Sequence, residues 1–281
     1  MKGWNAMKIT RRQLKQICES YLEESVRIEE AITFGKKRKK KKTAGTKSSQ
    51  ESAGSGPISS GKYPNDMIRL LEKEMDEVGI TNQFSRIALL SVVAKESGLK
   101  PKSEKTYDKT SVSRIKEIWP WLGKKYSDAE INDLKKSTSP SDGNQQPGLG
   151  LFDIVYGPER PSGRTYGNDS PGDGSRYRGR GFNQVTWKAS YKKYAELSGI
   201  DIVSDPDKLN DPVVAAKVTV KFLANRLKQK FKTVNPEFTS QSQANEMLAR
   251  ANAGWGKGGS ALSRAISSTN KESAHFKSAN A

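Results

Sequence analysis

The first residue that could do chemistry is Glu96, at the end of an apolar segment. Between Phe84 and Gly98 the apolar residues recur with helical spacing, and Gly98 stands where a left-handed residue would end the helix. At about 100° per residue, Glu96 lies on the same side of this helix as Leu89. A carboxyl group beside apolar neighbours and the negative end of the helix dipole is expected to favour its protonated form. The pattern predicts a general acid.

Glu96 also has an ordinary structural interpretation. A glutamate in the last turn can extend past its apolar neighbours into solvent, beside the lysine that precedes it, Lys95. The local sequence leaves both interpretations open.

The composition excludes several other kinds of chemistry. The chain has one cysteine, Cys18, and one histidine, His275. It can therefore form no intrachain disulfide, and neither a His-rich metal site nor a Ser-His-Asp triad is expected.

Longer motifs in the sequence resemble those of glycoside hydrolase family 19, the plant-type chitinases and their phage endolysin relatives. Ala94–Gly98 is similar to the helix end that carries the family's acid, with Lys95 in place of the family's histidine. Tyr177–Thr186, with the sequence YRGRGFNQVT, is similar to the family's YRGRG-x-x-Q-x-T segment. The family's VYG, DP and INGG motifs have counterparts at Val155–Gly157, Asn210–Pro212 and Arg250–Gly254. The likeness covers about residues 66–268.

The resemblance implies two catalytic glutamates. Glu96 corresponds to the family's general acid, and Glu104 fits its general base best, with Asp108 as the alternative. The acid would protonate the leaving oxygen while the base activates a water on the other face of the sugar, which requires about 6.5–9.5 Å between the carboxyl groups. The resemblance implies no metal and no cofactor. It assigns substrate contacts to Tyr177, Arg178, Gln184, Thr186, Ser190, Tyr191, Asn252 and Arg264.

Some of these residues also have structural explanations. Thr186 could cap the helix expected to begin at Trp187. Trp187, Tyr191 and Tyr194 share one helix face, which is more typical of a core than of a sugar platform. Ser190 stands where the family has an asparagine, and a serine has the shorter reach.

The elements that must position these residues are expected to be mainly helical. The Gly-, Pro- and Ser-rich stretch 137–175 predicts a surface insertion or part of a cleft wall. With the resemblance, this indicates a lysozyme-like, two-lobed helical domain with a central cleft. Helical spacing predicts helices near 64–78, 83–97, 111–118, 127–136, 187–198, 212–230, 241–252 and 259–268.

The chain is expected to have three parts. Residues 1–35 predict an amphipathic helix that serves as an attachment arm, and 36–62 predict a Lys-rich, then Ser/Gly-rich, flexible linker. Residues 63–281 form the expected hydrolase domain. We find no apolar run long enough for a membrane span and no secretory signal.

The net charge of +18 favours an anionic partner. With the resemblance, we expect an inverting phage-type lysozyme or endolysin that hydrolyses β-1,4 bonds of bacterial peptidoglycan, in a virion or an infected host cell. The basic run would bind an anionic cell envelope, and the N-terminal helix would bind tail or baseplate proteins of a virion. Nucleic acid is disfavoured because no aromatic residues alternate with the lysines. Two alternatives stay open: a chitinase acting on GlcNAc polymers, and a non-catalytic module that binds glycan or nucleic acid.

Overall fold

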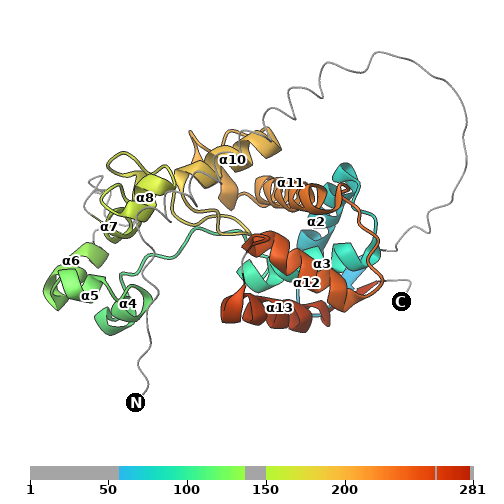
Figure 1. Cartoon of the computed structure of the whole chain (residues 1–281), viewed down its shortest axis with the longest axis horizontal. Helices are drawn as coiled ribbons and strands as arrows, with labels where there is room; N and C mark the ends of the chain where they lie inside the picture. Colours follow the sequence, from blue (N-terminus) through green and yellow to red (C-terminus); the bar gives the residue numbers. More distant parts are fainter. Residues whose placement is uncertain (1–56, 137–149, 257, 279–281) are drawn as a thin grey trace, which may run out of the picture. The chain divides into compact units, whose positions relative to one another are not determined.

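The computed structural model describes residues 57–136, 150–256 and 258–278, and it is mainly helical (Figure 1). This confirms the predicted class. The attachment arm expected over 1–35 lies outside the described residues, as does the basic run of the expected linker. None of the described helices is long and apolar enough to cross a membrane.

Every helix predicted from the spacing is present. The structure adds short helices at α5, α7, α8, α9 and the 3-10 helix η2, which have too few residues to show a periodic pattern. The bounds are α2 Asn65–Val78, α3 Gln83–Ser97, α4 Val112–Ile118, α5 Leu122–Lys125, α6 Asp128–Lys136, α7 Leu151–Tyr156, α8 Pro161–Thr165, α9 Asp173–Arg176, α10 Lys188–Ser198, η2 Pro206–Asn210, α11 Pro212–Phe231, α12 Gln241–Ala253 and α13 Gly259–Ser273.

Local capping explains where several helices begin and end. The Asn82 side chain accepts a hydrogen bond from Ser85 N at the start of α3, and Asp211 accepts from Val213 N and Val214 N at the start of α11. Gly98 ends α3 in the left-handed conformation, with φ of 64°. These caps set the position of Glu96 in the last turn of α3.

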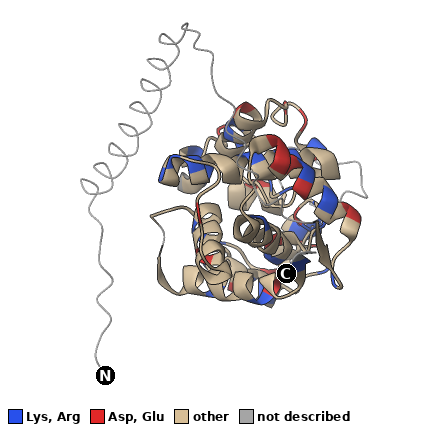
Figure 2. Cartoon of the chain, turned by 90° about the vertical axis from the view of Figure 1, so that its right-hand side faces the viewer, with Lys and Arg blue, Asp and Glu red and all other residues tan. Residues whose placement is uncertain are grey.

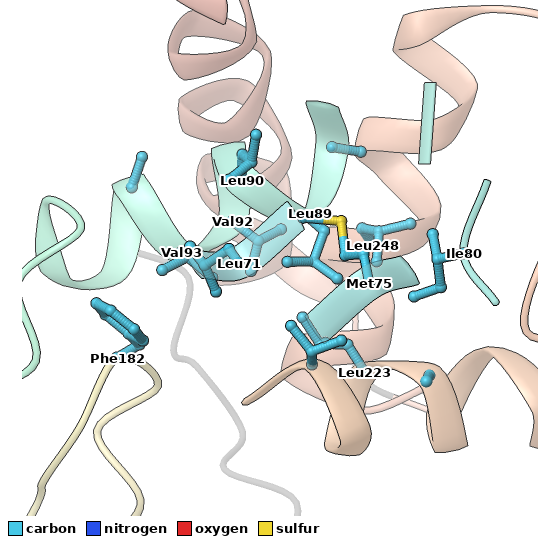
Figure 3. Close-up of a cluster of buried hydrophobic side chains, with 14 of the residues drawn as sticks. Leu71, Met75, Ile80, Leu89, Leu90, Val92, Val93, Phe182, Leu223 and Leu248 are labelled. Atoms are coloured by element: carbon cyan, nitrogen blue, oxygen red, sulfur yellow. The ribbon is translucent and has the colours of Figure 1, made fainter. Parts of the chain in front are cut away.

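The largest apolar cluster joins α2, α3, α11 and α12 (Figure 3). Leu89 of α3, Leu223 of α11 and Leu248 of α12 are fully buried in it. Each such side chain contributes about 1.5–3 kcal/mol by leaving water. Phe182, from the YRGRG segment, is buried in the same cluster, so this segment and α3 share one core.

Two smaller apolar clusters support the rest of the described chain. One is formed by α4 to α7 and includes Ile115, Leu122 and Phe152. The other includes Tyr177 and Tyr191. The segment that bears Glu104 follows α3 and precedes α4, so it leads from the first cluster to the second.

The domain begins earlier than the sequence predicts. Strand β1 (Ile58–Ser60) pairs antiparallel with β2 (Phe276–Ser278) near the C-terminus. Ile58 is fully buried, and its backbone N donates to Glu72 Oε1 at 3.0 Å. Residues 57–62, assigned to the flexible linker, therefore pack with the helices, because this segment supplies a core side chain and a paired strand edge.

Candidate active site

Glu96 lies in the last turn of α3, where its carboxylate meets two donors. Its Oε1 accepts a hydrogen bond from Asn252 Nδ2 at 3.0 Å and lies 2.5 Å from Lys95 Nζ. The Glu96 side chain is 26% exposed. The Glu96 side chain is therefore neither fully buried against the core nor fully exposed to solvent. The contact with Asn252 joins two residues that the sequence assigned to one site.

Asn252 is positioned by α12, which packs directly against α3. It lies in the last turn, before Gly254, whose φ of 106° ends the helix. The backbone at this end is also held by Arg226, whose Nε donates to Ala251 O at 3.1 Å. The amide of Asn252 thus approaches Glu96 from a separate element of the same core.

The carboxylate of Glu104 is held by donors from three parts of the chain. Its Oε1 accepts from Tyr107 Oη at 3.0 Å and from Tyr156 Oη at 3.1 Å. Its Oε2 accepts from Gly179 N at 3.3 Å, and Glu104 N donates to Gly179 O at 2.6 Å. A carboxylate with three donors is fixed in position, and hydrogen bonds to a charged group are stronger than neutral ones.

Both tyrosines keep their protons at neutral pH. Burial, followed by the nearby charge of Glu104, raises the pKa of Tyr107 well above its ordinary value. Burial, followed by the same charge, also raises the pKa of Tyr156. The two hydroxyl groups are therefore permanent donors to Glu104.

The YRGRG segment forms a tight loop beside Glu104. Arg180 and Val185 pair across it through both backbone hydrogen bonds. A Cβ on Gly179 would lie 3.0 Å from Gln184 Oε1 and 3.4 Å from Glu104 Oε2 and Thr186 Oγ1. Because residue 179 is a glycine, the side chains of Gln184 and Thr186 can lie next to the Glu104 carboxylate.

The arginines and Tyr177 of this segment, together with Tyr191 of α10, act mainly in packing. Tyr191 is fully buried and its Oη donates to Arg178 O at 2.8 Å, and burial raises its pKa to about 12. Tyr177 is buried in the same small cluster. Arg178 Nη1 donates to Ser175 O at 2.9 Å. Arg180, 3% exposed, donates from Nε to Asp207 Oδ1 at 2.6 Å. These hydrogen bonds hold the loop and do not reach Glu96 or Glu104, although the charge of Glu104 also acts on Arg178.

Three sequence-predicted residues make no hydrogen bond with either carboxylate within the described residues. Within the described residues, neither Ser190 nor Arg264 makes a hydrogen bond or ion pair with Glu96 or Glu104. Arg264 is exposed on α13. Asp108 accepts a hydrogen bond from Thr106 Oγ1, which lowers the pKa of Asp108. It does not share the donors of Glu104, and this favours Glu104 over Asp108 as the second carboxylate.

Sequence reasoning missed Tyr107 and Tyr156 as partners of Glu104. Tyr107 lies in the segment that carries Glu104, and Tyr156 is the central residue of the VYG motif. The VYG motif indicated that Tyr156 has a role, but only the tertiary contacts show that its hydroxyl donates a hydrogen bond to Glu104.

The two glutamates share no hydrogen-bond partner in the described segments. The donors of Glu96 come from α3 and α12, whereas those of Glu104 come from residues 104–107, α7 and Gly179. The carboxyl separation and the central cleft of an inverting enzyme therefore stay predictions. A pocket of about 570 Å³ is lined by residues of α12 and α13 and includes neither Glu96 nor Glu104. Its lining residues are Glu246, Ser263, Ile266, Ser267, Asn270 and Lys271.

In the three described ranges, no group of three or more His, Cys, Asp or Glu residues is arranged to hold a metal ion.

Comparison with solved structures finds chitinases at low similarity. A mutant of chitinase C is 14% identical with a TM-score of 0.39, over 76% of this chain and 68% of that one. Chitinase C from Streptomyces griseus is 16% identical with a TM-score of 0.30, over 69% and 77% of the two chains. No family model and no curated protein matches the chain. TM-scores at this level do not assign a fold.

Proposed function

We propose that this chain is an inverting glycosidase of the phage-lysozyme type that hydrolyses β-1,4 bonds of bacterial peptidoglycan. The observation that carries the proposal is the fixed carboxylate of Glu104, which receives donors from the VYG motif, the YRGRG motif and its own segment. Three converging donors are more than an ordinary surface glutamate requires. They suit a base that must stay aimed at one point.

In the proposed reaction, Glu96 gives a proton to the leaving glycosidic oxygen. Asn252 holds Oε1 of Glu96 and sets the orientation of the carboxyl group. The contact with Lys95 has to weaken when Glu96 carries the proton, because a neutral carboxyl no longer attracts the ammonium. A bound sugar that displaces water and the lysine would favour this state.

Glu104 takes the proton of the attacking water. The side chains of Gln184 and Thr186 and the Glu104 carboxylate all lie close to Gly179. The polar groups of Gln184 and Thr186 can therefore contact that water or an N-acetyl group. Inversion then follows if the two carboxyl groups face opposite sides of the sugar at about 6.5–9.5 Å.

Positive charge near Glu104 favours peptidoglycan over chitin. Lys100, Lys102 and Lys105 surround Glu104 in the sequence and are exposed, and none pairs with a carboxylate within the described residues. Figure 2 shows that elsewhere acidic and basic residues mix on the described helices. Peptidoglycan carries carboxylates on its peptides whereas chitin is neutral, so exposed lysines attract the former, in a salt-dependent way.

Digestion of purified peptidoglycan and of chitin tests the proposal. New reducing ends are identified by mass spectrometry, and the anomer formed first is identified by proton NMR. Glu96→Gln and Glu104→Gln are each expected to lower turnover about 10²–10⁴-fold while binding is kept. Glu237→Gln, a change at an exposed loop glutamate, is the matched control.

The outcomes separate the candidate functions. Cleavage of chitin in preference to peptidoglycan identifies the chitinase alternative. Full activity in both glutamine variants refutes the two assigned roles. Binding without turnover in the wild-type protein identifies a non-catalytic module.

A further inference from the structure

We propose that Tyr166 and Trp187 form an aromatic platform that stacks on a sugar ring of the glycan beside Glu104. The inference rests on the proposed function for the identity of the ligand. It assigns a binding role to Tyr166, and it changes the core role that helical spacing predicts for Trp187.

Tyr166 and Trp187 form a partly exposed pair of rings that is connected to the candidate base through Tyr156. Tyr166 is 49% exposed, and its ring centroid lies 5.3 Å from that of the half-buried Trp187, at an interplanar angle of 37°. Trp187 in turn meets Tyr156 edge-on at 5.1 Å. The hydroxyl of Tyr156 donates to Glu104. Two ring contacts therefore separate the exposed ring from the tyrosine that holds the carboxylate.

The backbone of Trp187 is strained. Its φ is 77° and its ψ 137°, a conformation that a bulky side chain rarely adopts and that costs about 1–3 kcal/mol. The strain is held by a hydrogen bond from Trp187 N to Tyr177 O at 2.9 Å. Trp187 with this conformation lies just before α10, and its ring contacts that of Tyr166.

A buried asparagine fixes the segments that carry the three rings. Asn168 is fully buried, and its Nδ2 donates to Tyr156 O at 2.8 Å while its Oδ1 accepts from Lys188 N at 2.9 Å. Ala189 N donates to Tyr166 O at 3.0 Å. The end of α7, the turn at Tyr166 and the start of α10 are therefore held together, so the rings are preorganised and lose little freedom on binding.

The chemistry of the pair matches a sugar ring. An exposed aromatic face offers a large apolar surface at low conformational cost, while the hydroxyl and indole N–H at the ring edges can bond to polar groups. A pyranose has an apolar face of C–H groups and a rim of hydroxyls. A single exposed tyrosine is ordinary on a protein surface, but the coupling to Trp187, Tyr156 and Glu104 places this one at the edge of the candidate site.

Ligand binding with and without the Tyr166 ring tests the platform. The probes are a GlcNAc tetramer, a GlcNAc hexamer and soluble peptidoglycan strands, titrated against the full chain with Glu104→Gln to prevent turnover. Tryptophan fluorescence reports binding, and Trp187→Phe shows which part of the signal comes from Trp187. Tyr166→Ala is expected to raise the Kd of the hexamer or of the strands about tenfold, or about 1.4 kcal/mol. Tyr166→Phe, which keeps the ring, is expected to change it less than about twofold on the same scale.

The result separates this inference from the proposed function. If Tyr166→Ala leaves Kd and kcat/KM unchanged for all probes and the wild-type chain turns over the glycan, the platform is refuted and the proposed function is not. Tyr166-dependent binding without turnover in the wild-type chain supports the platform and refutes the glycosidase. No binding of any probe refutes the platform. Because Tyr166 is half exposed, its variants should melt like the wild type, and equal thermal unfolding checks that the fold is intact.

Discussion

Removing the hydroxyl of Tyr156 tests whether Glu104 works as a positioned base. Tyr156→Phe keeps the ring contacts with Trp119, Phe152 and Trp187 and deletes one of three donors to the carboxylate. A hydrogen bond to a charged group contributes about 1.5–3 kcal/mol, and each 1.4 kcal/mol is about tenfold in rate. Tyr107 and Gly179 N remain and hold part of the orientation. We therefore expect kcat to fall about tenfold in the single variant, with KM little changed.

The double variant sharpens this test. In Tyr107→Phe/Tyr156→Phe, Gly179 N is the one donor to the Glu104 side chain that remains among the described residues. By the same energies, kcat is expected to fall to about a hundredth of the wild-type value. The assay is the rate of reducing-end formation from soluble peptidoglycan strands. The control is Tyr126→Phe, which removes a phenol hydroxyl that makes no hydrogen bond with Glu104 within the described residues. If the single and the double variants both stay within about twofold of wild type, the donors to Glu104 play no part in catalysis, and the assignment of the base loses its main support.

The remaining predictions concern the loop, the domain edge and one buried charge. Gly179→Ala should lower glycosidase activity, and it should lower the free energy of unfolding by about 1 kcal/mol or more, because the new Cβ would lie 3.0 Å from Gln184 Oε1. The glycan assay measures the activity and urea unfolding measures the stability. Wild-type values in both would show that the loop accommodates the new methyl group. A chain that starts at Pro57 should unfold like the full chain. A chain that starts at Tyr63 should have a free energy of unfolding lower by about 2–4 kcal/mol, because it lacks buried Ile58 and the strand that pairs with β2. Equal urea midpoints for the two truncations would place the start of the domain where the sequence predicted it. Glu74 is buried, and burial raises its pKa, so its ionisation destabilises the folded state above that pKa and the penalty disappears as the pH falls through it. Glu74→Gln should therefore raise the free energy of unfolding at pH 7 but give no such gain in acid, and a gain of the same size at both pH values would contradict this cause.

Local features of the sequence predicted most of the helical framework. The caps at Asn82 and Asp211 and the glycine at 98 act within one or two turns, so the pattern of nearby residues is enough to place α3 and α11. The short helices α7, α8 and α9 were not predicted because they are stabilised by packing rather than by a long periodic face.

The candidate site was predicted in part. The prediction that Glu96 lies at the end of α3 is confirmed, and Asn252, named from a motif, contacts it. The roles of the two glutamates in catalysis stay predictions. The local sequence left open whether Glu96 faces the core or extends into solvent beside Lys95. In the structure the side chain lies between these extremes and contacts Lys95 and Asn252, because the direction of a side chain depends on what packs around it.

The sequence by itself determined that the chain is mainly helical, where α3 ends and which glycine-rich segment lies near a site, since these follow from propensity, periodicity and motif. Tertiary structure alone decided that Tyr107, Tyr156 and Gly179 converge on Glu104, that Ile58 belongs to the core, and that Trp187 turns towards Tyr166. The physical reason is that each of these contacts joins residues through packing of separate elements, and such packing depends on the shape and burial of the whole assembled core rather than on neighbours along the chain.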